Sequence, residues 1–443
     1  MEEFACADAV YDFLNRFLNF ERKLEPPAYR LDRMVALKDL FGAPDETYRA
    51  VHVAGSKGKG STATMIASIL SLVDPPVGLY TSPHLLHFTE RIAVNGDPVG
   101  DGILLPCAEE LAAGLQGRAP EDFPGGEAPT YFELLTMLGF LCFRKAGCKR
   151  AVIEVGLGGR LDSTNVITPE VCVITPIELE HTELLGDTIP KIASEKAGII
   201  KSGIPVYTSA LRPDALRVIR DTAIRMAAPL TVLDEAAEIG DVRISASGTS
   251  FTARFMDRRS GPASLDLVTP LIGEVQARNA TLAALVALDL GIASDTIAEG
   301  LRLGRLRARF EIIPGNPTVV LDGAHTPDSV RACAADFLSI FPLGGILLFG
   351  CAKDKDPIAM AGELSGISGD VIVTRPGTFK ESDVDAIAEA FAGKGFSVRI
   401  EADTQKAILA ALDHAAKRNA PLLITGSFYL CAEAARFLEG RNG

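Results

Sequence analysis

The most informative stretch of the chain is AVHVAGSKGKGST, residues 50–62. Its apolar start, Ala50–Ala54, predicts a buried strand, and the apolar spacing from Ser61 to about Leu72 predicts a helix. The glycines between them allow a tight turn whose N–H groups point at phosphate oxygens, and the helix presents its positive end to the same anion. This order of strand, glycine-rich turn and helix indicates a phosphate-binding loop.

Several residues of the turn are candidates for nucleotide binding. Lys59 can reach the β- and γ-phosphates, and a hydroxyl from Ser61 or Thr62 can face magnesium or phosphate. The spacing departs from the strict G-x-x-x-x-G-K-[ST] form, because Gly60 stands between the lysine and the serine. The alternative is a flexible loop with a solvated lysine pair. The flanking strand and helix favour phosphate binding.

Strand and helix patterns alternate along the chain, which favours an α/β fold with a mostly parallel sheet covered on both faces. Helices are expected from about Ala7 to Lys23 and over Leu282–Leu290, and residues 116–129, rich in Gly and Pro, read as a surface loop. Apolar runs predict further strands at Val77–Tyr80, Ala151–Val155, Val171–Ile174 and Ile204–Tyr207. After a basic stretch at Arg302–Arg309, a second series is predicted at Val319–Leu321, Gly345–Phe349, Val371–Val373, Ser397–Ile400 and Leu422–Ile424.

This second series predicts two domains with a boundary near residue 305. We expect residues 1–304 to form an N-terminal parallel-sheet domain of the P-loop ATPase type. Residues 305–443 are expected to form a smaller C-terminal Rossmann-like α/β domain. The coarse picture is two nucleotide-fold-like domains with a cleft between them.

Composition narrows the class of protein. The 443 residues include 44 Lys and Arg against 57 Asp and Glu, a net charge of −13, which argues against nucleic acid or a membrane surface as partner. The apolar share of 47% is ordinary for a globular enzyme. The eight scattered cysteines form no C-x-x-C pair and read as thiols of a reducing compartment. With an acidic N-terminus and no long apolar run, the expectation is a soluble cytoplasmic protein.

Polar residues stand where several predicted strands end. Ser82 follows Val77–Tyr80, although a turn or cap residue is the more common role of such a serine. Glu154 ends a strand that reads as buried, so its carboxylate must be paired, protonated or bound to a metal. Magnesium ligation is the most economical of these near a phosphate site. His181 follows another strand end, where a capped or core histidine is more frequent than a ligand.

Taken together, these segments resemble the folylpolyglutamate synthase and dihydrofolate synthase branch of the Mur ligase superfamily. The resemblance covers almost the whole chain and is carried by Gly55–Thr62, Thr81–His84, Glu154–Asp162, His181–Thr188, Glu195–Ile199, Asp322–His325 and Thr425–Ser427. It implies an ATP-dependent amide ligase that adds L-glutamate to dihydropteroate, to tetrahydrofolates, or to both. The acceptor carboxylate would take the γ-phosphate of ATP, and the amine of glutamate would displace phosphate from the resulting acyl phosphate.

The resemblance also implies roles for single residues. Gly58, Lys59, Gly60 and Ser61 would hold the ATP phosphates. Ser82 and Glu154 would bind a first Mg²⁺, and His181 a second one together with Lys196. Lysine at the position of Lys196 is usually carbamylated in this family, which makes it an anionic ligand; unmodified, it would contact phosphate or a carboxylate directly. Further nucleotide contacts would come from Gln276, Asn279, Arg309 and Asp322, and the catalytic candidates are Lys59, Lys196 and His325.

The acceptor pocket is implied in the same way, by the segments Thr130, Tyr131, Phe132, Glu133 and Leu161, Asp162, Ser163. An aromatic pair with a carboxylate suits a flat heterocycle bearing N–H donors. On physical grounds alone, Tyr131 and Phe132 could equally begin a helix over Phe132–Phe143 and simply pack.

The chain departs from the family pattern at Ser56-Lys57, Glu180, Thr326 and Arg307-Ala308. Two other functions therefore stay open, a Mur-type ligase for another acid and amino acid, and a nucleotide-binding module without ligation. A monovalent cation is a further candidate cofactor, and the resemblance suggests a monomer.

Overall fold

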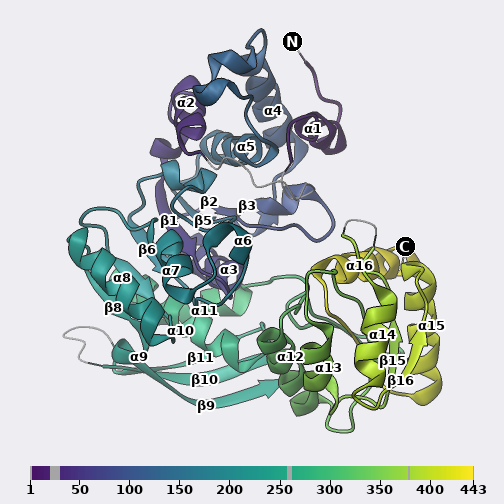
Figure 1. The fold of residues 1–443 in the computed structure, drawn as a ribbon. Helices are drawn as coiled ribbons and strands as arrows, with labels where there is room; N and C mark the ends of the chain where they lie inside the picture. Colours follow the sequence, from purple (N-terminus) through teal and green to yellow (C-terminus); the bar gives the residue numbers. More distant parts are fainter. Residues whose placement is uncertain (1, 20–29, 257–261, 378–379, 443) are drawn as a thin grey trace. The chain divides into compact units, whose positions relative to one another are not determined.

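The structure is a computed structural model that describes residues 2–19, 30–256, 262–377 and 380–442 (Figure 1). The chain divides into two compact units. The first comprises Met1–Gly240, Thr252–Leu267 and Arg278–Gly304, and the second comprises Asp241–Phe251, Val268–Ala277 and Arg305–Gly443.

The last change of unit falls between Gly304 and Arg305, whereas the expected N-terminal domain of residues 1–304 is interrupted by two segments of the second unit. Each earlier change lies inside a strand of a small sheet or in the first turn of a helix, so no linker-like composition marks it in the sequence. The assignment of ligase domains to residues 1–304 and 305–443 stays a prediction.

The first unit contains an eight-stranded sheet in the order β4-β3-β2-β5-β1-β6-β7-β8. The six strands from β2 to β8 in this order pair in parallel, while β3 and β4 add an antiparallel edge. This arrangement confirms the predicted parallel-sheet architecture. The strands are β1 (Arg49–Ala54), β2 (Val77–Tyr80), β3 (Ile92–Val94), β4 (Asp97–Pro98), β5 (Arg150–Glu154), β6 (Val171–Ile174), β7 (Val206–Thr208) and β8 (Leu230–Val232).

Helices cover this sheet and form its cores with it. One buried cluster joins α4 and α5 to Ile153 of β5, and another joins α7 and α8 to Ile174 of β6. Helix α3 packs against β2 and β5, and α11 packs against α3. The helices are α1 (Ala7–Leu14), α2 (Asp32–Leu40), α3 (Lys59–Ser71), α4 (Asp101–Leu115), α5 (Tyr131–Lys145), α6 (Thr182–Leu185), α7 (Ile189–Ala197), α8 (Pro213–Arg225), α9 (Leu233–Ala236), α10 (Glu274–Asp289) and α11 (Ser294–Leu303).

The first helix is shorter than the predicted Ala7–Lys23. It ends at Leu14, because Asn15 closes it with both its backbone N–H and its side-chain amide directed at Tyr11 O. Residues 20–23 of the prediction lie outside the described part of the chain. The predicted loop at residues 116–129 contains only two short 3₁₀ turns, Pro120–Asp122 and Pro124–Gly126.

A three-stranded sheet in the order β11-β10-β9 was not predicted. Its strands are β9 (Ala237–Ser245), β10 (Gly248–Phe255) and β11 (Ser264–Thr269). Helix α10 follows the sheet directly, so the sheet leads the chain into the helix that carries Gln276 and Asn279.

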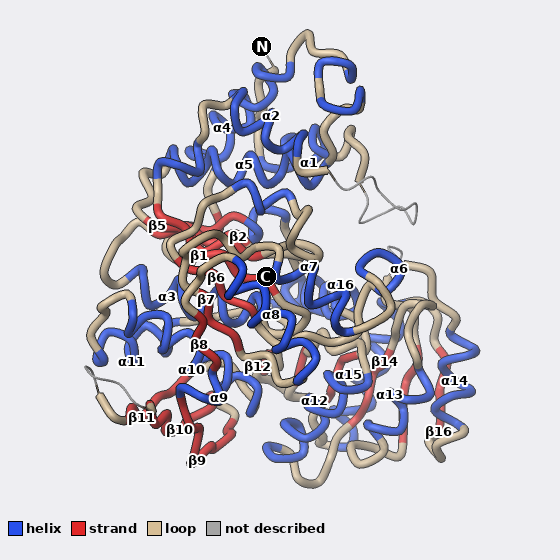
Figure 2. Tube along the Cα trace, turned by 60° about the vertical axis from the view of Figure 1, so that its left-hand side comes forward, coloured by secondary structure: helices blue, strands red, loops and turns tan. Residues whose placement is uncertain are grey.

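The second unit contains a six-stranded sheet in the order β12-β13-β17-β14-β15-β16, parallel except for the edge strand β12. Figure 2 shows its strands between helices, as expected for a Rossmann-like α/β layer arrangement. The strands are β12 (Glu311–Ile313), β13 (Val319–Leu321), β14 (Ile346–Phe349), β15 (Asp370–Val373), β16 (Ser397–Ile400) and β17 (Leu422–Thr425). The helices are α12 (Pro327–Ile340), α13 (Pro357–Leu364), α14 (Val384–Ala392), α15 (Thr404–Arg418) and α16 (Phe428–Asn442).

Across the residues that the structure describes, we find no helix with both the length and the apolar character needed to cross a lipid bilayer.

Candidate active site

The glycine-rich turn connects β1 to α3, as predicted. Gly58 occupies the cap position of α3 with a φ of +83°, a left-handed conformation that glycine adopts without strain. The turn is fastened to the end of β6, because Ser56 N and Lys57 N donate to Pro176 O at 2.8 and 3.3 Å. These hydrogen bonds fix the turn against the segment after β6, and the N-terminus of α3 follows directly, a position that favours an anion such as phosphate.

Asn279 of α10 lies beside this turn. A Cβ added to Gly58 would stand 2.7 Å from Asn279 Oδ1, and the asparagine is 2% exposed. Two residues predicted to contact the nucleotide are thus neighbours in the first unit. Lys59 and Gly60, the first two residues of α3, are half-buried, and Ser61 is buried.

Glu154 and Ser82 meet at the same edge of the sheet. Glu154 ends β5 and is 3% exposed, and its Oε2 accepts a hydrogen bond of 3.1 Å from Ser82 N. Strands β1, β2 and β5 run in parallel, so their carboxyl ends carry the phosphate loop, Ser82 and Glu154 side by side. A buried carboxylate beside a phosphate loop has the chemistry that Mg²⁺ prefers.

Lys196 of α7 reaches the phosphate loop from the other side. Its side chain is 2% exposed, and its Nζ donates to Gly55 O at 2.7 Å and to Glu180 Oε1 at 2.8 Å. Burial, partly offset by Glu180, lowers the pKa of Lys196 to about 8. Burial alone would raise the pKa of Glu180, but Lys59 and Lys196 hold it at about 2. The longer Glu180, one of the departures from the family pattern, thus forms the ion pair with the lysine.

His181 follows Glu180 and is exposed, with a φ of +47° before α6. Within the described ranges, no three His, Cys, Asp or Glu side chains gather closely enough to hold a metal by themselves. Water and oxygens of a bound nucleotide would therefore complete a magnesium shell here. The ligand roles of Ser82, Glu154, His181 and Lys196 stay predictions.

The first predicted acceptor segment caps α5. Thr130 accepts from Glu133 N, and the Glu133 carboxylate accepts from Thr130 N at 2.7 Å. Glu133 also pairs with the buried Arg33 at 3.2 Å. Tyr131 is 1% exposed in the core of α4 and α5, so for this residue the structure agrees with the packing alternative. Phe132 is half-buried and lies against Gly156, where an added Cβ would be 2.3 Å from the ring.

The second predicted acceptor segment is buried except for Leu161, which is half-buried. The Asp162 carboxylate accepts from Leu157 N at 2.8 Å, from Thr164 N at 3.0 Å and from Thr164 Oγ1 at 2.5 Å. Burial, opposed by these hydrogen bonds, raises the pKa of Asp162. Ser163 begins the short 3₁₀ turn Ser163–Val166 and is 9% exposed.

The second unit brings Arg309, Asp322 and His325 together. The Asp322 carboxylate accepts from Phe310 N and Ala324 N, both at 2.8 Å, and burial raises its pKa against the opposing charge of Arg309. The Arg309 guanidinium stands 5.5 Å from the centre of the Phe428 ring. His325 Nδ1 lies 2.8 Å from Gly323 O, which can only accept, so Nδ1 carries the proton. Gln276 lies in the first turn of α10, in the part of that helix that belongs to the second unit.

Three buried polar residues that hold these segments were not predicted from the sequence: Arg33, His52 and Thr164. Arg33 pairs with Glu133, and His52 of β1 contacts Thr164, the residue that holds Asp162. A histidine inside an apolar strand was a visible signal in the sequence, but its partner 112 residues away was not.

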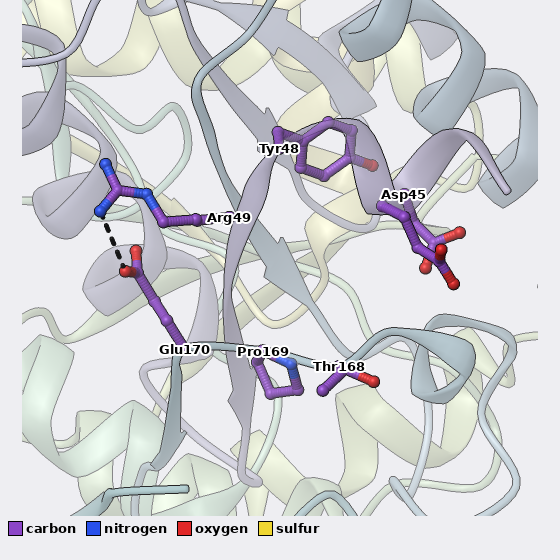
Figure 3. Close-up of a pocket in the computed structure, with 7 residues that line it drawn as sticks. Asp45, Tyr48, Arg49, Thr168, Pro169 and Glu170 are labelled. Carbon is purple, nitrogen blue, oxygen red and sulfur yellow. Dashed lines mark ion pairs between the residues drawn. The ribbon is translucent and has the colours of Figure 1, made fainter.

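A separate cavity of about 340 Å³ lies at the opposite end of β1 from the phosphate loop (Figure 3). The Arg49–Glu170 ion pair, 3.7 Å long, stands at one side of it and Asp45 at the other. None of the predicted site residues lines it; the lining residues are Asp45, Glu46, Tyr48, Arg49, Thr168, Pro169 and Glu170.

Comparison with known proteins defines the class. The family model of the Mur ligase middle domain matches residues 53–287, and that of the Mur ligase glutamate ligase domain matches residues 308–428. The parallel-sheet unit with its glycine-rich turn and the second α/β unit therefore belong to a Mur-type ATP-dependent ligase.

Close relatives identify the branch. The chain is 35% identical to the folylpolyglutamate synthase of Lacticaseibacillus casei over 420 residues, which covers 92% of this chain and 94% of that protein. It is 34% identical to the dihydrofolate synthase/folylpolyglutamate synthase of Bacillus subtilis, with coverage of 92% and 95%. The chain belongs to the folylpolyglutamate synthase and dihydrofolate synthase family, which confirms the predicted resemblance.

Solved structures agree with this assignment. A Mycobacterium tuberculosis folylpolyglutamate synthase complexed with ADP and AMPPCP matches with a TM-score of 0.87 and 31% identity over 99% of both chains. A complex of a folylpolyglutamate synthase with AMPPCP and folate matches with a TM-score of 0.83 and 32% identity over 98% of this chain and 99% of that one.

Proposed function

We propose that this ATP-dependent ligase adds L-glutamate to the carboxylate of a folate-type acceptor, either dihydropteroate, a tetrahydrofolate polyglutamate, or both. The observation that carries the proposal is the edge of the first sheet, where the phosphate loop, the Glu154 carboxylate and buried Lys196 converge. The relatives' names supply the acceptor class, since they are folylpolyglutamate and dihydrofolate synthases.

The chemistry follows from the weakness of a carboxylate as an acylating agent. The acceptor carboxylate oxygen attacks the γ-phosphorus of ATP, which forms an acyl phosphate and releases ADP. The glutamate amine then attacks the acyl carbon, and phosphate leaves with the C–O bond electrons while the amine loses a proton. The protein chiefly positions these anions and neutralises their charge.

Magnesium fits this arrangement. Glu154 and Ser82 would hold one ion beside the phosphates, and His181 with Lys196 a second. When bound, such ions offset the repulsion between ATP and the attacking carboxylate. Lys59 extends the positive charge of the phosphate loop, and Arg309, Asp322 and Asn279 are proposed to bind the nucleotide. His325 is proposed as a catalytic residue, and Gln276 as a nucleotide contact.

Carbamylation of Lys196 is part of the proposal. A carbamate forms when a neutral amine attacks CO₂, so a lysine whose pKa is lowered to about 8 is a better nucleophile than an exposed one. The modified side chain would carry oxygens able to ligate a cation. In the unmodified form the ammonium donates to Gly55 O and Glu180 instead.

The cellular compartment, the oligomeric state and the binding partners are also proposed. The eight cysteines are all free thiols, and seven of them are buried, which fits a reducing compartment such as the cytoplasm. We further propose a monomer that binds neither nucleic acid nor membranes, with a monovalent cation as a candidate cofactor.

ADP release tests the proposal directly. Purified protein is given ATP, Mg²⁺ and L-glutamate with dihydropteroate, with tetrahydrofolate, or with no acceptor. Folate-dependent and glutamate-dependent ADP release is expected with at least one acceptor. Glutamate-dependent turnover that ignores both folates would favour a Mur-type ligase for another acid. ATP binding without ADP release in any combination would favour a nucleotide-binding module.

A further inference from the structure

His52 is a buried histidine that the proposed reaction does not use. It lies in the middle of β1, two residues before that strand ends at Ala54, and it is 0% exposed. Its Nε2 is 2.9 Å from the hydroxyl oxygen of Thr164, a residue that is also 0% exposed. Buried polar groups are nearly always hydrogen-bonded, so this short contact is a hydrogen bond between the two side chains.

The proton positions in this pair follow from its neighbours. The Thr164 hydroxyl donates to Asp162 Oδ1 at 2.5 Å, and the same carboxylate accepts from two backbone N–H groups, so its oxygens act as acceptors. Since a hydroxyl has a single proton, Thr164 must accept from His52, which places the proton on Nε2. Nδ1 then carries a lone pair, and it has no hydrogen-bond partner among the described residues. Burial lowers the pKa of His52 to about 3, in keeping with a neutral ring.

This chain of hydrogen bonds ends at the glycine-rich loop after β5. Asp162 Oδ2 holds Leu157 N at 2.8 Å, which closes the loop upon itself. The Asn165 side-chain amide donates to Arg160 O at 3.0 Å and to Gly198 O at 3.2 Å, which fastens the loop to the end of α7. The loop therefore has few ways to change shape while the contacts at Asp162 persist.

We propose that His52 is a positioning residue for acceptor binding: through Thr164 it fixes Asp162 and with it the loop Gly156–Ser163 that takes the folate-type acid. The inference rests on the proposed function. Strand β1 would then contribute to both substrate sites. Its carboxyl end leads into the phosphate loop, and His52 in its middle holds the acceptor loop in place. His52 itself does not touch the reacting atoms.

Four variants test this role in the full chain. His52→Leu and Thr164→Val remove the donor and the hydroxyl, whereas His52→Gln keeps an N–H near the position of Nε2 and Thr164→Ser keeps the hydroxyl. The first two should raise the KM for the folate acceptor about tenfold, the scale of one lost buried hydrogen bond. The KM for ATP should stay within about twofold. His52→Gln and Thr164→Ser should restore most of the acceptor affinity.

The double variant adds a second criterion. Because both residues act through one relay, His52→Leu combined with Thr164→Val should raise the acceptor KM no further than either change alone. Thr164→Val preserves side-chain shape, so it carries the test should His52→Leu fail to fold.

An unchanged acceptor KM in Thr164→Val and His52→Leu, with only kcat or the active fraction reduced, would overturn the inference. So would equal losses in the leucine and glutamine variants. These outcomes leave the proposed function intact, because wild-type turnover with a folate defines it. Wild-type protein that turns over no folate at all would instead overturn the proposed function and this inference with it.

Discussion

Gly159→Ala is the substitution whose effect can be worked most directly from the structure. A Cβ at this position would stand 2.8 Å from Glu195 O and 3.1 Å from Lys196 Cα. Both are backbone atoms of α7, and Arg160 N already donates to the same carbonyl at 2.8 Å. The clash cannot be relieved by rotating a side chain, so the loop or the helix has to shift by a few tenths of an ångström.

The expected cost of such overpacking is about 1–3 kcal/mol of unfolding free energy. Activity should fall as well, because the displaced backbone carries Lys196, whose Nζ lies 2.7 Å from Gly55 O in the glycine-rich turn. Because a misplacement of about 1 Å can lower turnover about 100-fold, we expect the smaller shift here to cost less than that. Urea unfolding and ADP release measure the two effects on the same preparation.

Gly102→Ala provides a matched control. Gly102 lies in the first turn of α4, and a Cβ there would meet nothing within 4 Å. The same change should leave turnover unaltered and keep or raise stability by up to about 1 kcal/mol, since alanine favours a helix. A Gly159→Ala protein as stable and as active as the Gly102→Ala protein would refute the close packing of the loop on α7. Lost stability with full turnover would refute only the link to Lys196.

Three further substitutions and one control variant test other features of the molecule. Lys196→Ala should lower the rate of ADP release at least about 100-fold. If a carbamate is the missing group, bicarbonate or short carboxylic acids should restore part of this rate. Full activity of the variant would rule out a ligand role for Lys196. His52→Gln should flatten the acid side of the stability profile. The folded pKa of about 3 lies below the ordinary 6.5, so between these values the unfolded wild-type chain binds an extra proton and stability decreases as the pH is lowered. Urea unfolding should show this difference as up to about 1.4 kcal/mol per pH unit, and parallel profiles would contradict it. Arg33→Met leaves the Glu133 carboxylate, 5% exposed, without its ion-pair partner and should lower the free energy of unfolding by about 3–5 kcal/mol. As a control, Lys417→Met breaks an ion pair with Asp413 whose side chains are 72% and 61% exposed, and should lower it by about 0.5 kcal/mol or less. Equal losses in the two variants would contradict the burial of the Arg33–Glu133 pair.

The parts of the fold that follow from local sequence were predictable. An apolar run, a glycine-rich turn and a helical pattern are contiguous at residues 50–62, so the strand, the turn and the start of α3 were predicted directly. The end of α1 was not, because one side chain, Asn15, closes the helix although apolar spacing continues to Phe17 and Leu18.

The small antiparallel sheet was missed for a different reason. Val242 and Ile244 of β9 alternate with polar residues, a period-two pattern, but it stands inside a chain dominated by buried parallel strands with continuous apolar runs. Changes of compact unit inside these strands leave no trace in composition.

Partner choice within the site could not be predicted at all. The sequence marks Glu180 as unusual and Lys196 as a candidate ligand, yet their ion pair depends on how α7 packs beside the phosphate loop. Likewise the sequence predicts Glu133 as a carboxylate of the acceptor pocket, whereas in the structure it pairs with Arg33, 100 residues earlier in the chain. Such pairings are set by tertiary contacts rather than by local pattern.

Isotope transfer tests the central chemical claim most directly. A folate acceptor labelled with ¹⁸O in its reacting carboxylate is turned over with ATP, Mg²⁺ and L-glutamate, and the released inorganic phosphate is analysed by mass spectrometry. An acyl phosphate requires one labelled oxygen to leave with each phosphate formed. Phosphate that carries no label, at a matched amount of amide product, would contradict the account.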